Sequence, residues 1–139
     1  MKEYFGKYRG IVTDVNDPKK MGRIKARVPA ITGESETTWC LPCLPYAGNG
    51  YGLKFTPAVG DCIWVEFERG KVNYPIWTGC WFAQGKDTLG QWEIVTPNGT
   101  ISFSGGAINI QATSVNISQS GDSGVVATRD WCDKRFKLK

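Results

Sequence analysis

The first 82 residues alternate between apolar and polar side chains with the period of two that is typical of half-buried β-strands. The clearest case is residues 61–68, where Ile63, Val65 and Phe67 alternate with side chains of the opposite face. No segment has the 3.6-residue apolar period of a long amphipathic helix. The predicted strands are residues 8–14, 23–28, 38–41, 61–68 and 75–81. Five short strands without a long helix predict an all-β unit with the architecture of a five-stranded OB-fold barrel.

Two connections of this unit have turn or loop chemistry. Residues 17–22, Asp-Pro-Lys-Lys-Met-Gly, combine a proline that restricts φ with a permissive glycine and therefore predict a turn. Residues 44–57 contain two prolines and three glycines and predict a long irregular loop. Such a loop commonly carries a contact surface, although it is also suited simply to bridge the barrel.

Beyond the barrel the apolar pattern changes to a seven-residue repeat between Ile94 and Ser118. Side chains of a strand alternate faces, so a spacing of seven cannot stay on one side of a continuous strand. The chain must turn within each unit, and small or turn-prone residues stand at 98–99, 105–106 and 113–114. Each unit is predicted to be one short strand. The apolar side chains of the repeat are Ile94, Ile101, Phe103, Ile108, Ile110, Val115 and Ile117.

These apolar side chains are too few to form a core alone, because burial is worth roughly 25 cal/mol per Å² while ordering costs about 1–2 kcal/mol per residue. Repeat units that cannot cover their own apolar face usually bury it on neighbouring units. We therefore predict a homo-oligomer whose core these seven side chains form. Residues 83–128 contain only one basic and three acidic side chains, which is compatible with like chains lying together. The alternative is a simple β-meander packed on the barrel.

Composition sets the outer limits. A chain of 139 residues with 41% hydrophobic residues and 17 glycines is typical of a folded, turn-rich protein. The N-terminus lacks the apolar run of a secretory signal, and no apolar stretch is long enough to cross a bilayer, so we expect synthesis in a cytoplasm. The five cysteines are an odd number without the spacing of a small secreted domain, which favours reduced thiols.

Candidate chemistry is sparse. Cys40 and Cys43 form a C-x-x-C pair, and with Cys62 and Cys80 they would supply four thiolates for zinc, but the second pair lacks matching spacing. Cysteines next to tryptophans in strands are more often small buried hydrophobic residues.

Nor does the chain offer clear catalytic groups. It has no histidine, the commonest general base. Asp61, Glu66 and Glu68 are the nearest approach to a carboxylate pair, but the two glutamates share one strand face and show no contrast of environment. We expect neither an enzyme nor a cofactor.

The barrel region resembles the OB-fold domain of contractile-tail spike proteins, a family that includes phage baseplate hub and spike proteins, baseplate assembly protein V and the type VI secretion spike. The resemblance covers roughly the first 82 residues. No single motif is specific to the family, but the whole set of motifs in this order is. The residues that carry it are 16–18 (Asn-Asp-Pro), 22–24 (Gly-Arg-Ile), 27–29 (Arg-Val-Pro), Trp39, Pro42, 45–48 (Pro-Tyr-Ala-Gly), Pro57, 60–61 (Gly-Asp), 64–68 (Trp-Val-Glu-Phe-Glu), 74–75 (Tyr-Pro), Trp77, Gly79 and Trp81.

The resemblance implies a homotrimer whose barrels form a collar at the end of the tail tube and whose C-terminal strands form an intertwined β-helix or β-prism. It implies a virion protein of the tail baseplate that touches tail-tube or hub proteins and, transiently, the host envelope. The number three and the tail context come from the resemblance alone. The need for partner chains comes from the repeat.

The chain departs from the family in two ways. Only about ten residues separate Trp81 from Trp92, which leaves no room for the lysozyme domain of some members, and the histidines of an iron-binding tip are absent. We expect residues 1–82 to form the barrel, 83–91 a linker, 92–128 the spike segment and 129–139 a basic tail. A separate protein capping the short spike is a further expectation, with possible contacts at Trp131, Arg135 and Phe136. A solvated C-terminal end is the commoner fate of such a tail.

The alternative function is an OB-fold module that binds single-stranded nucleic acid or an oligosaccharide on a basic and aromatic strand face. Nucleic-acid binding depends on dense Lys and Arg clusters, whereas residues 1–82 contain 11 basic and 8 acidic side chains. We therefore expect no stable nucleic-acid binding, and we interpret aromatics such as Trp77 and Trp81 as core. The candidate face would consist of Arg23, Lys25, Arg27, Trp64 and Tyr74.

Overall fold

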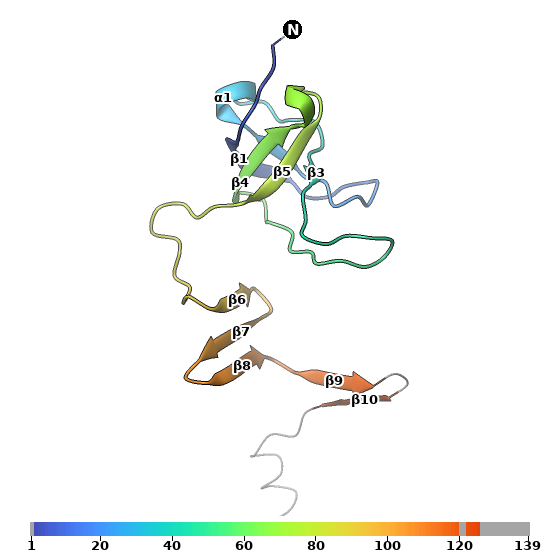
Figure 1. Ribbon diagram of the computed structural model, residues 1–139, viewed down its shortest axis with the longest axis vertical. Helices are drawn as coiled ribbons and strands as arrows, with labels where there is room; N and C mark the ends of the chain where they lie inside the picture. Colours follow the sequence, from blue (N-terminus) through green and yellow to red (C-terminus); the bar gives the residue numbers. More distant parts are fainter. Residues whose placement is uncertain (1, 120–121, 126–139) are drawn as a thin grey trace, which may run out of the picture. The chain divides into compact units, whose positions relative to one another are not determined.

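The computed structural model describes residues 2–119 and 122–125 and divides the chain into two compact units, Met1–Asp87 and Thr88–Lys139 (Figure 1). Trp131, Arg135 and Phe136, the expected contacts for a tip protein, lie outside the described residues.

The first unit is built on one five-stranded sheet that curls into a half-barrel (Figure 1). The strand order is β2-β1-β4-β5-β3, and every pair is antiparallel except β3 with β5. Irregular register in the β1–β2 and β4–β5 pairs adds local twist, which helps a small sheet to curl. The strands are β1 (Tyr8–Asp14), β2 (Lys25–Arg27), β3 (Leu41–Pro42), β4 (Cys62–Phe67) and β5 (Pro75–Cys80).

All five predicted strands exist, but two are much shorter than the sequence indicates. β2 begins only at Lys25, because the backbone N–H of Arg23 donates to the carboxylate of Asp17 instead of to a strand. The N–H of Ala26 likewise donates to the hydroxyl of Thr37, at 3.2 Å, which interrupts the ladder with the segment before β3. Pairing there is reduced to two isolated bridges, Ile24 with Cys40 and Arg27 with Glu36.

The core lies on the concave side of the sheet, and the predicted alternation of β4 is confirmed. Ile63, Val65 and Phe67 are at most 6% exposed, while the intervening side chains are half-buried. Trp77 belongs to this core as expected, whereas Trp81 is only half-buried, which corrects the interpretation of both as core. The complete core is Val12, Ile24, Ala26, Val28, Cys40, Ile63, Val65, Phe67 and Trp77.

Helical structure in the described residues is limited to α1 (Pro29–Thr32) and the 3-10 turn η1 (Glu68–Gly70). Pro29 stands at the first turn of α1, where its missing N–H costs nothing, and it ends the extended segment of β2. Over the part of the chain that the structure describes, no helix is long and apolar enough to cross a membrane.

The second unit consists of short antiparallel strands. One strand lies between each pair of successive turns, as the repeat predicts. Three of them form the sheet β6-β7-β8, and β9 with β10 forms a separate hairpin. The breaks fall at residues 97–98, 105–106 and 113–115, so the first turn lies one residue earlier than predicted. The strands are β6 (Glu93–Thr96), β7 (Gly99–Ser104), β8 (Ala107–Ala112), β9 (Asn116–Gln119) and β10 (Asp122–Val125).

Candidate functional site

Strand pairing in the second unit gathers five predicted core residues on one face of its three-stranded sheet. Residues directly opposite one another in an antiparallel pair point to the same side of the sheet. Ile101 lies opposite both Ile94 and Ile110, and Phe103, two residues further on, lies opposite Ile108. We call these five side chains the apolar face.

The apolar face is exposed. Exposed fractions run from 36% at Ile101 to 66% at Ile108, although each of these side chains is large and hydrophobic. The opposite side of the same strands has polar residues such as Ser102, Asn109 and Gln111, although it also contains the exposed Val95. A contiguous apolar surface of this kind marks an interaction site.

Two of the seven predicted core residues lie elsewhere in the second unit. Val115 falls in the break between β8 and β9 and is half-buried, and Ile117 lies on β9, 67% exposed. The seven-residue spacing also does not place Ile108 beside Ile101, because the two-residue turn at Gly105 and Gly106 puts Ile108 opposite Phe103. The role of all seven side chains in a trimer stays a prediction.

Trp92 also belongs to this site, although the seven-residue repeat does not include it. Its carbonyl oxygen accepts a hydrogen bond from the Phe103 backbone N–H at 3.0 Å, and its side chain is 70% exposed. The signal was present, because Trp92 precedes Ile94 by two residues and so continues the same alternation.

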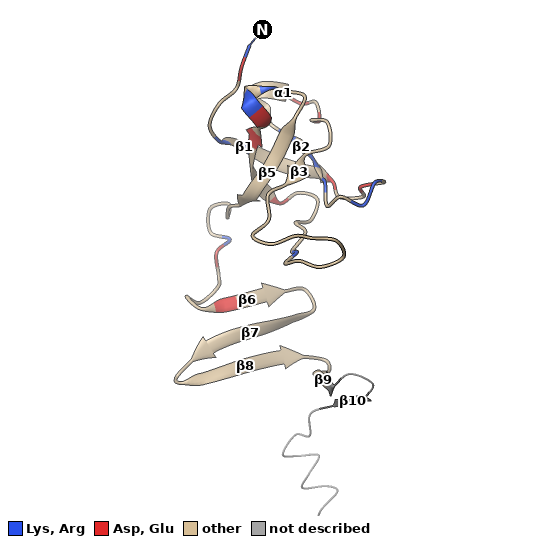
Figure 2. Ribbon diagram, turned by 45° about the vertical axis from the view of Figure 1, so that its right-hand side comes forward, with Lys and Arg blue, Asp and Glu red and all other residues tan. Residues whose placement is uncertain are grey.

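The outer edges of this sheet are also open. Among the described strands, β6 and β8 each pair only with β7, so one edge of each presents unpaired backbone groups. Figure 2 shows that β7 and β8 contain no charged residue, and β6 contains only Glu93. Natural edge strands are usually protected by charges, so an uncharged open edge is suited to pairing with another strand.

At one end of the barrel, the connection between β1 and β2 is fixed by Asp17. Its carboxylate accepts five hydrogen bonds, from the backbone N–H groups of Lys19, Met21 and Arg23 and from Nε and Nη2 of Arg23. The side chains of Asp17 and Arg23 are 5% and 14% exposed. The bond from the Arg23 guanidinium, followed by the backbone donors, holds the pKa of Asp17 well below its usual range. This arrangement fixes the loop and leaves the carboxylate no free lone pairs for chemistry.

The four cysteines that the structure describes differ in burial, which corrects the view of them as buried small hydrophobic residues. Only Cys40 is fully buried, and burial raises the pKa of its thiol to about 11 despite the nearby Thr37 hydroxyl. Cys62 is half-buried, whereas Cys43 and Cys80 are exposed. All four are free thiols, and within the described residues no three Cys, Asp or Glu side chains form a group that could hold a metal ion.

The structure gives each of the three candidate carboxylates a structural role. Glu66 pairs with Lys7 at 3.0 Å, Asp61 accepts a hydrogen bond from the Ala58 N–H at 2.8 Å, and Glu68 begins η1. No pair of them shows the contrast of environments that acid–base catalysis needs.

The basic residues of the alternative nucleic-acid face likewise have partners within the chain. Arg23 and Lys25 lie over the ring of Trp39, at 5.6 and 5.1 Å from its centroid, and Arg27 pairs with Glu34. Of the predicted aromatic members, Trp64 lies beside Trp81 with the two rings tilted by 43°, and Arg9 lies over both rings. Tyr74 is exposed. Of the three predicted cations, Arg23 and Lys25 thus lie at Trp39, whereas the cation over Trp64 is Arg9.

Comparison with known proteins identifies the class to which this fold belongs. Residues 8–82 match the family model described as the type VI secretion system/phage-baseplate injector OB domain. The match begins with the first residue of β1 and ends just after β5, so it spans the whole half-barrel. Because it covers more than half of the chain, the protein belongs to this family, as the sequence resemblance indicated. No curated protein matches the chain.

Membership of this family supports a structural role in an injector baseplate and implies a component of a virion or tail baseplate. The family domain is a structural OB domain, not one known for enzymatic activity.

Proposed function

We propose that this protein is the central spike of a contractile-tail baseplate, a non-enzymatic homotrimer that joins the tail tube to the envelope-piercing tip. The half-barrels form the collar, which contacts tail-tube or hub proteins. The C-terminal strands of three chains combine into an intertwined β-helix or β-prism that forms the spike. A separate protein at the end of the spike completes the device.

The observation that supports this proposal is the exposed apolar face of the second unit. Full burial of a side chain such as Ile or Phe is worth roughly 1.5–3 kcal/mol, so covering all five would stabilise the assembly considerably. A single chain leaves them between 36% and 66% exposed. Three copies packed by these faces would bury them around a common axis.

Open strand edges that contain a single charged residue, Glu93 on β6, support intertwining. In a closed assembly, β8 of one chain would pair with β6 of the next, and each chain would satisfy backbone groups that it leaves open alone. The low charge of the segment allows three like strands to lie together without repulsion. The number three is taken from the family resemblance, not from the strand geometry.

The mass of the full-length protein in solution tests this proposal. We expect sedimentation equilibrium to give three times the chain mass of 15.4 kDa over a wide range of concentration. Replacing Ile108 by Asp puts a carboxylate into the apolar face and should give monomers, because an unpaired buried charge is costly. Asn109→Asp is the matched control, since Asn109 is the next residue on β8 and lies on the polar side.

A wild-type protein that stays monomeric at high concentration would overturn the proposal. So would equal effects of Ile108→Asp and Asn109→Asp on the mass. Electron microscopy of tails, with a label on this chain, tests the location at the tail end. Complete tails that lack any further spike component would count against the separate tip protein.

A further inference from the structure

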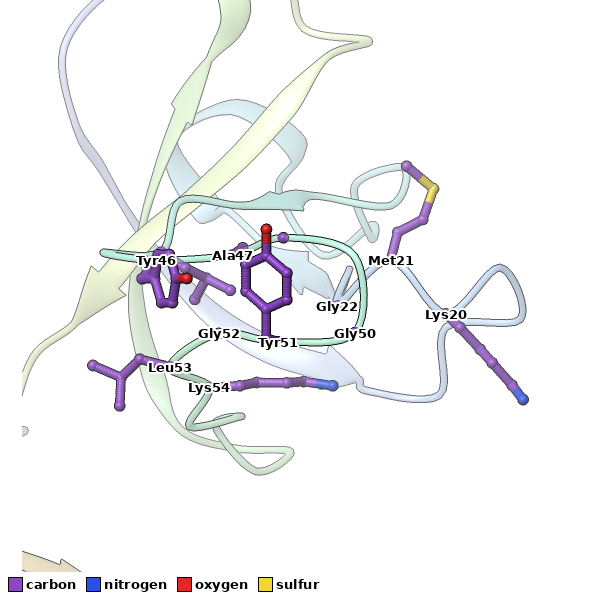
Figure 3. Close-up of a pocket in the computed structure, with 12 residues that line it drawn as sticks. Lys20, Met21, Gly22, Tyr46, Ala47, Gly50, Tyr51, Gly52, Leu53 and Lys54 are labelled. Atoms are coloured by element: carbon purple, nitrogen blue, oxygen red, sulfur yellow. The ribbon is translucent and has the colours of Figure 1, made fainter.

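The loop between β3 and β4, residues 44–57, carries two exposed tyrosine rings beside a hollow in the first unit. The rings of Tyr46 and Tyr51 are 59% and 60% exposed and lie 5.5 Å apart. They line a hollow of about 320 Å³ whose other wall is the connection between β1 and β2. Figure 3 shows the Tyr51 ring lying across the loop, with Met21 and Lys20 on the neighbouring connection. A concave surface of this size with aromatic walls is typical of a site for a small ligand.

The loop positions the Tyr51 ring through its own contacts. Ala47 and Gly52 form a bridge across the loop. The Gly48 N–H donates to the Tyr51 carbonyl at 2.8 Å. A Cβ at position 48 would overlap the Tyr51 ring, so a glycine there lets the ring lie against the backbone. A site that is ordered in advance loses little conformational entropy when a ligand binds.

The charged side chains of the hollow are both positive. Lys20 and Lys54 line it, and among the described residues no acidic side chain does so. Neither lysine forms an ion pair within the part of the chain that the structure describes. Cations without a carboxylate partner, placed beside a hollow, favour an anionic ligand. Five other cations of the first unit do pair with carboxylates, namely Lys7, Arg23, Lys25, Arg27 and Lys71.

The acidic residues on the segments that adjoin these two walls are held by the chain itself. Asp17 is bound by the Arg23 guanidinium at 2.7 Å. The carboxylates of Asp14 and Asp61 accept hydrogen bonds from backbone N–H groups. Since none of the three lines the hollow, a ligand inside it would contact the two lysines and no carboxylate.

Tyrosine rings and lysines together fit an anionic sugar. The face of an aromatic ring is negative and attracts the polarised C–H groups of a sugar ring. A lysine ammonium group donates charge-assisted hydrogen bonds to a carboxylate or a phosphate. Single-stranded nucleic acid needs a groove of cations that follows its backbone, whereas this hollow has only two. The chemistry of the hollow therefore favours a saccharide over a nucleic acid.

We propose that the hollow between residues 17–22 and 44–57 binds a sugar ring that carries a carboxylate or phosphate group. Tyr51 and Tyr46 contact the sugar ring, and Lys54 and Lys20 bind its acidic group. The site lies within the first unit of one chain, so this inference does not depend on the proposed homotrimer. It gives the barrel a binding function in addition to its structural role.

Titrations of the full-length protein, followed by the NMR shifts of its backbone amides, test this site. The acidic ligands are trigalacturonate, which carries carboxylates, and glucose 6-phosphate. The methyl ester of trigalacturonate and glucose are the matched ligands without charge. We expect saturable shifts within residues 17–22 and 44–57 for at least one acidic sugar, and binding about tenfold weaker for its neutral counterpart.

Substitutions then locate the binding groups. Tyr51→Ala should weaken binding about tenfold because it removes a ring face, whereas Tyr51→Phe should keep most of the affinity. Tyr74→Ala is the control, since Tyr74 is 57% exposed and lies outside the hollow. Lys54→Gln should weaken binding several-fold. Lys86→Gln removes the same charge outside the hollow and should leave the affinity unchanged.

The absence of saturable shifts with either acidic sugar at about 10 mM would overturn the proposal, because that concentration nearly fills a site with a Kd of about 1 mM. Equal affinity for acidic and neutral sugars would also overturn it. So would equal losses from the hollow variants and their two controls. If oligothymidylate shifts the same amides and the sugars do not, the hollow binds nucleic acid instead. A monomeric mass would overturn the homotrimer but leave a positive titration standing.

Discussion

The two units of this chain differ in how far they bury their apolar side chains. In the half-barrel, nine hydrophobic side chains are at most 6% exposed, and long-range pairing of five strands encloses them. In the second unit, the five side chains of the apolar face are at least 36% exposed, although they lie on a regular sheet. Alternation of apolar and polar residues is present in both. The difference is that the curled sheet of the half-barrel covers its own apolar side. A single three-stranded sheet has no second layer of structure to cover its apolar face.

Truncating one isoleucine in each unit should give the largest contrast. Ile63→Ala opens a cavity in the barrel core, and we expect it to lower the free energy of unfolding of the barrel by about 2–5 kcal/mol. Ile94→Ala should leave barrel unfolding within about 0.5 kcal/mol of wild type, because Ile94 is 45% exposed and outside the barrel. Denaturant unfolding, followed by far-UV circular dichroism at two protein concentrations, measures both effects.

For Ile94→Ala, the expected loss is in the association of chains, so its effect should depend on protein concentration. The effect of Ile63→Ala on barrel stability should not depend on protein concentration. Equal losses in barrel stability from the two substitutions would remove the distinction between a self-sufficient unit and one that needs partners.

The sequence predicted most of this division, and its failures have identifiable causes. Alternation in β4 places Ile63, Val65 and Phe67 inside, and the structure confirms it. Alternation does not reveal whether a side chain at the end of a strand is covered, and for this reason the prediction of a buried Cys80 is wrong. The length of β2 depended on the Thr37 hydroxyl, a contact between side chain and backbone that no periodicity contains.

In the second unit the repeat predicted the strands and their turns, but not which residues are opposite one another. That register depends on the number of residues in each turn. Two residues separate β7 from β8, which pairs Ile108 with Phe103. The loop of residues 44–57 shows a similar limit. Its composition predicted an irregular loop, whereas its internal bridge between Ala47 and Gly52 became visible only in the structure.

The next largest contrast between the two units should be the loss of stability in acid, which we expect in the barrel because of Asp17. Because its folded pKa is depressed, the contribution of Asp17 to stability is fully present above the ordinary carboxyl pKa of about 3.9 and is lost as the pH falls toward the depressed value. We expect Asp17→Asn to be less stable than wild type at pH 7 and to approach wild type as the pH falls below about 4. Urea midpoints for the barrel transition between pH 2 and pH 7 measure this difference.

Asp14→Asn is the control for this series. The Asp14 carboxylate accepts a hydrogen bond from the Asn16 N–H, a contact on the exposed surface, so we expect a smaller effect at neutral pH. Association of the C-terminal strands should change little over the same pH range, because residues 83–128 contain only three acidic side chains. A gap between Asp17→Asn and wild type that stays constant with pH would contradict this explanation.

The smallest contrast concerns one hydroxyl in each unit. Thr37 is 7% exposed, and its hydroxyl accepts a hydrogen bond from the Ala26 N–H at 3.2 Å. Thr37→Val keeps the shape but leaves that buried N–H without its acceptor, so we expect a loss of about 1–3 kcal/mol in barrel stability. Thr100→Val, on the polar side of β7, makes the same chemical change on a half-buried surface and should alter stability by less than about 0.5 kcal/mol. Denaturant unfolding of both variants measures the change in stability. Amide hydrogen exchange at Ala26 tests the cause, since faster exchange there is expected only for Thr37→Val. Unchanged exchange there would mean that the Thr37 hydroxyl does not protect the N–H that interrupts β2.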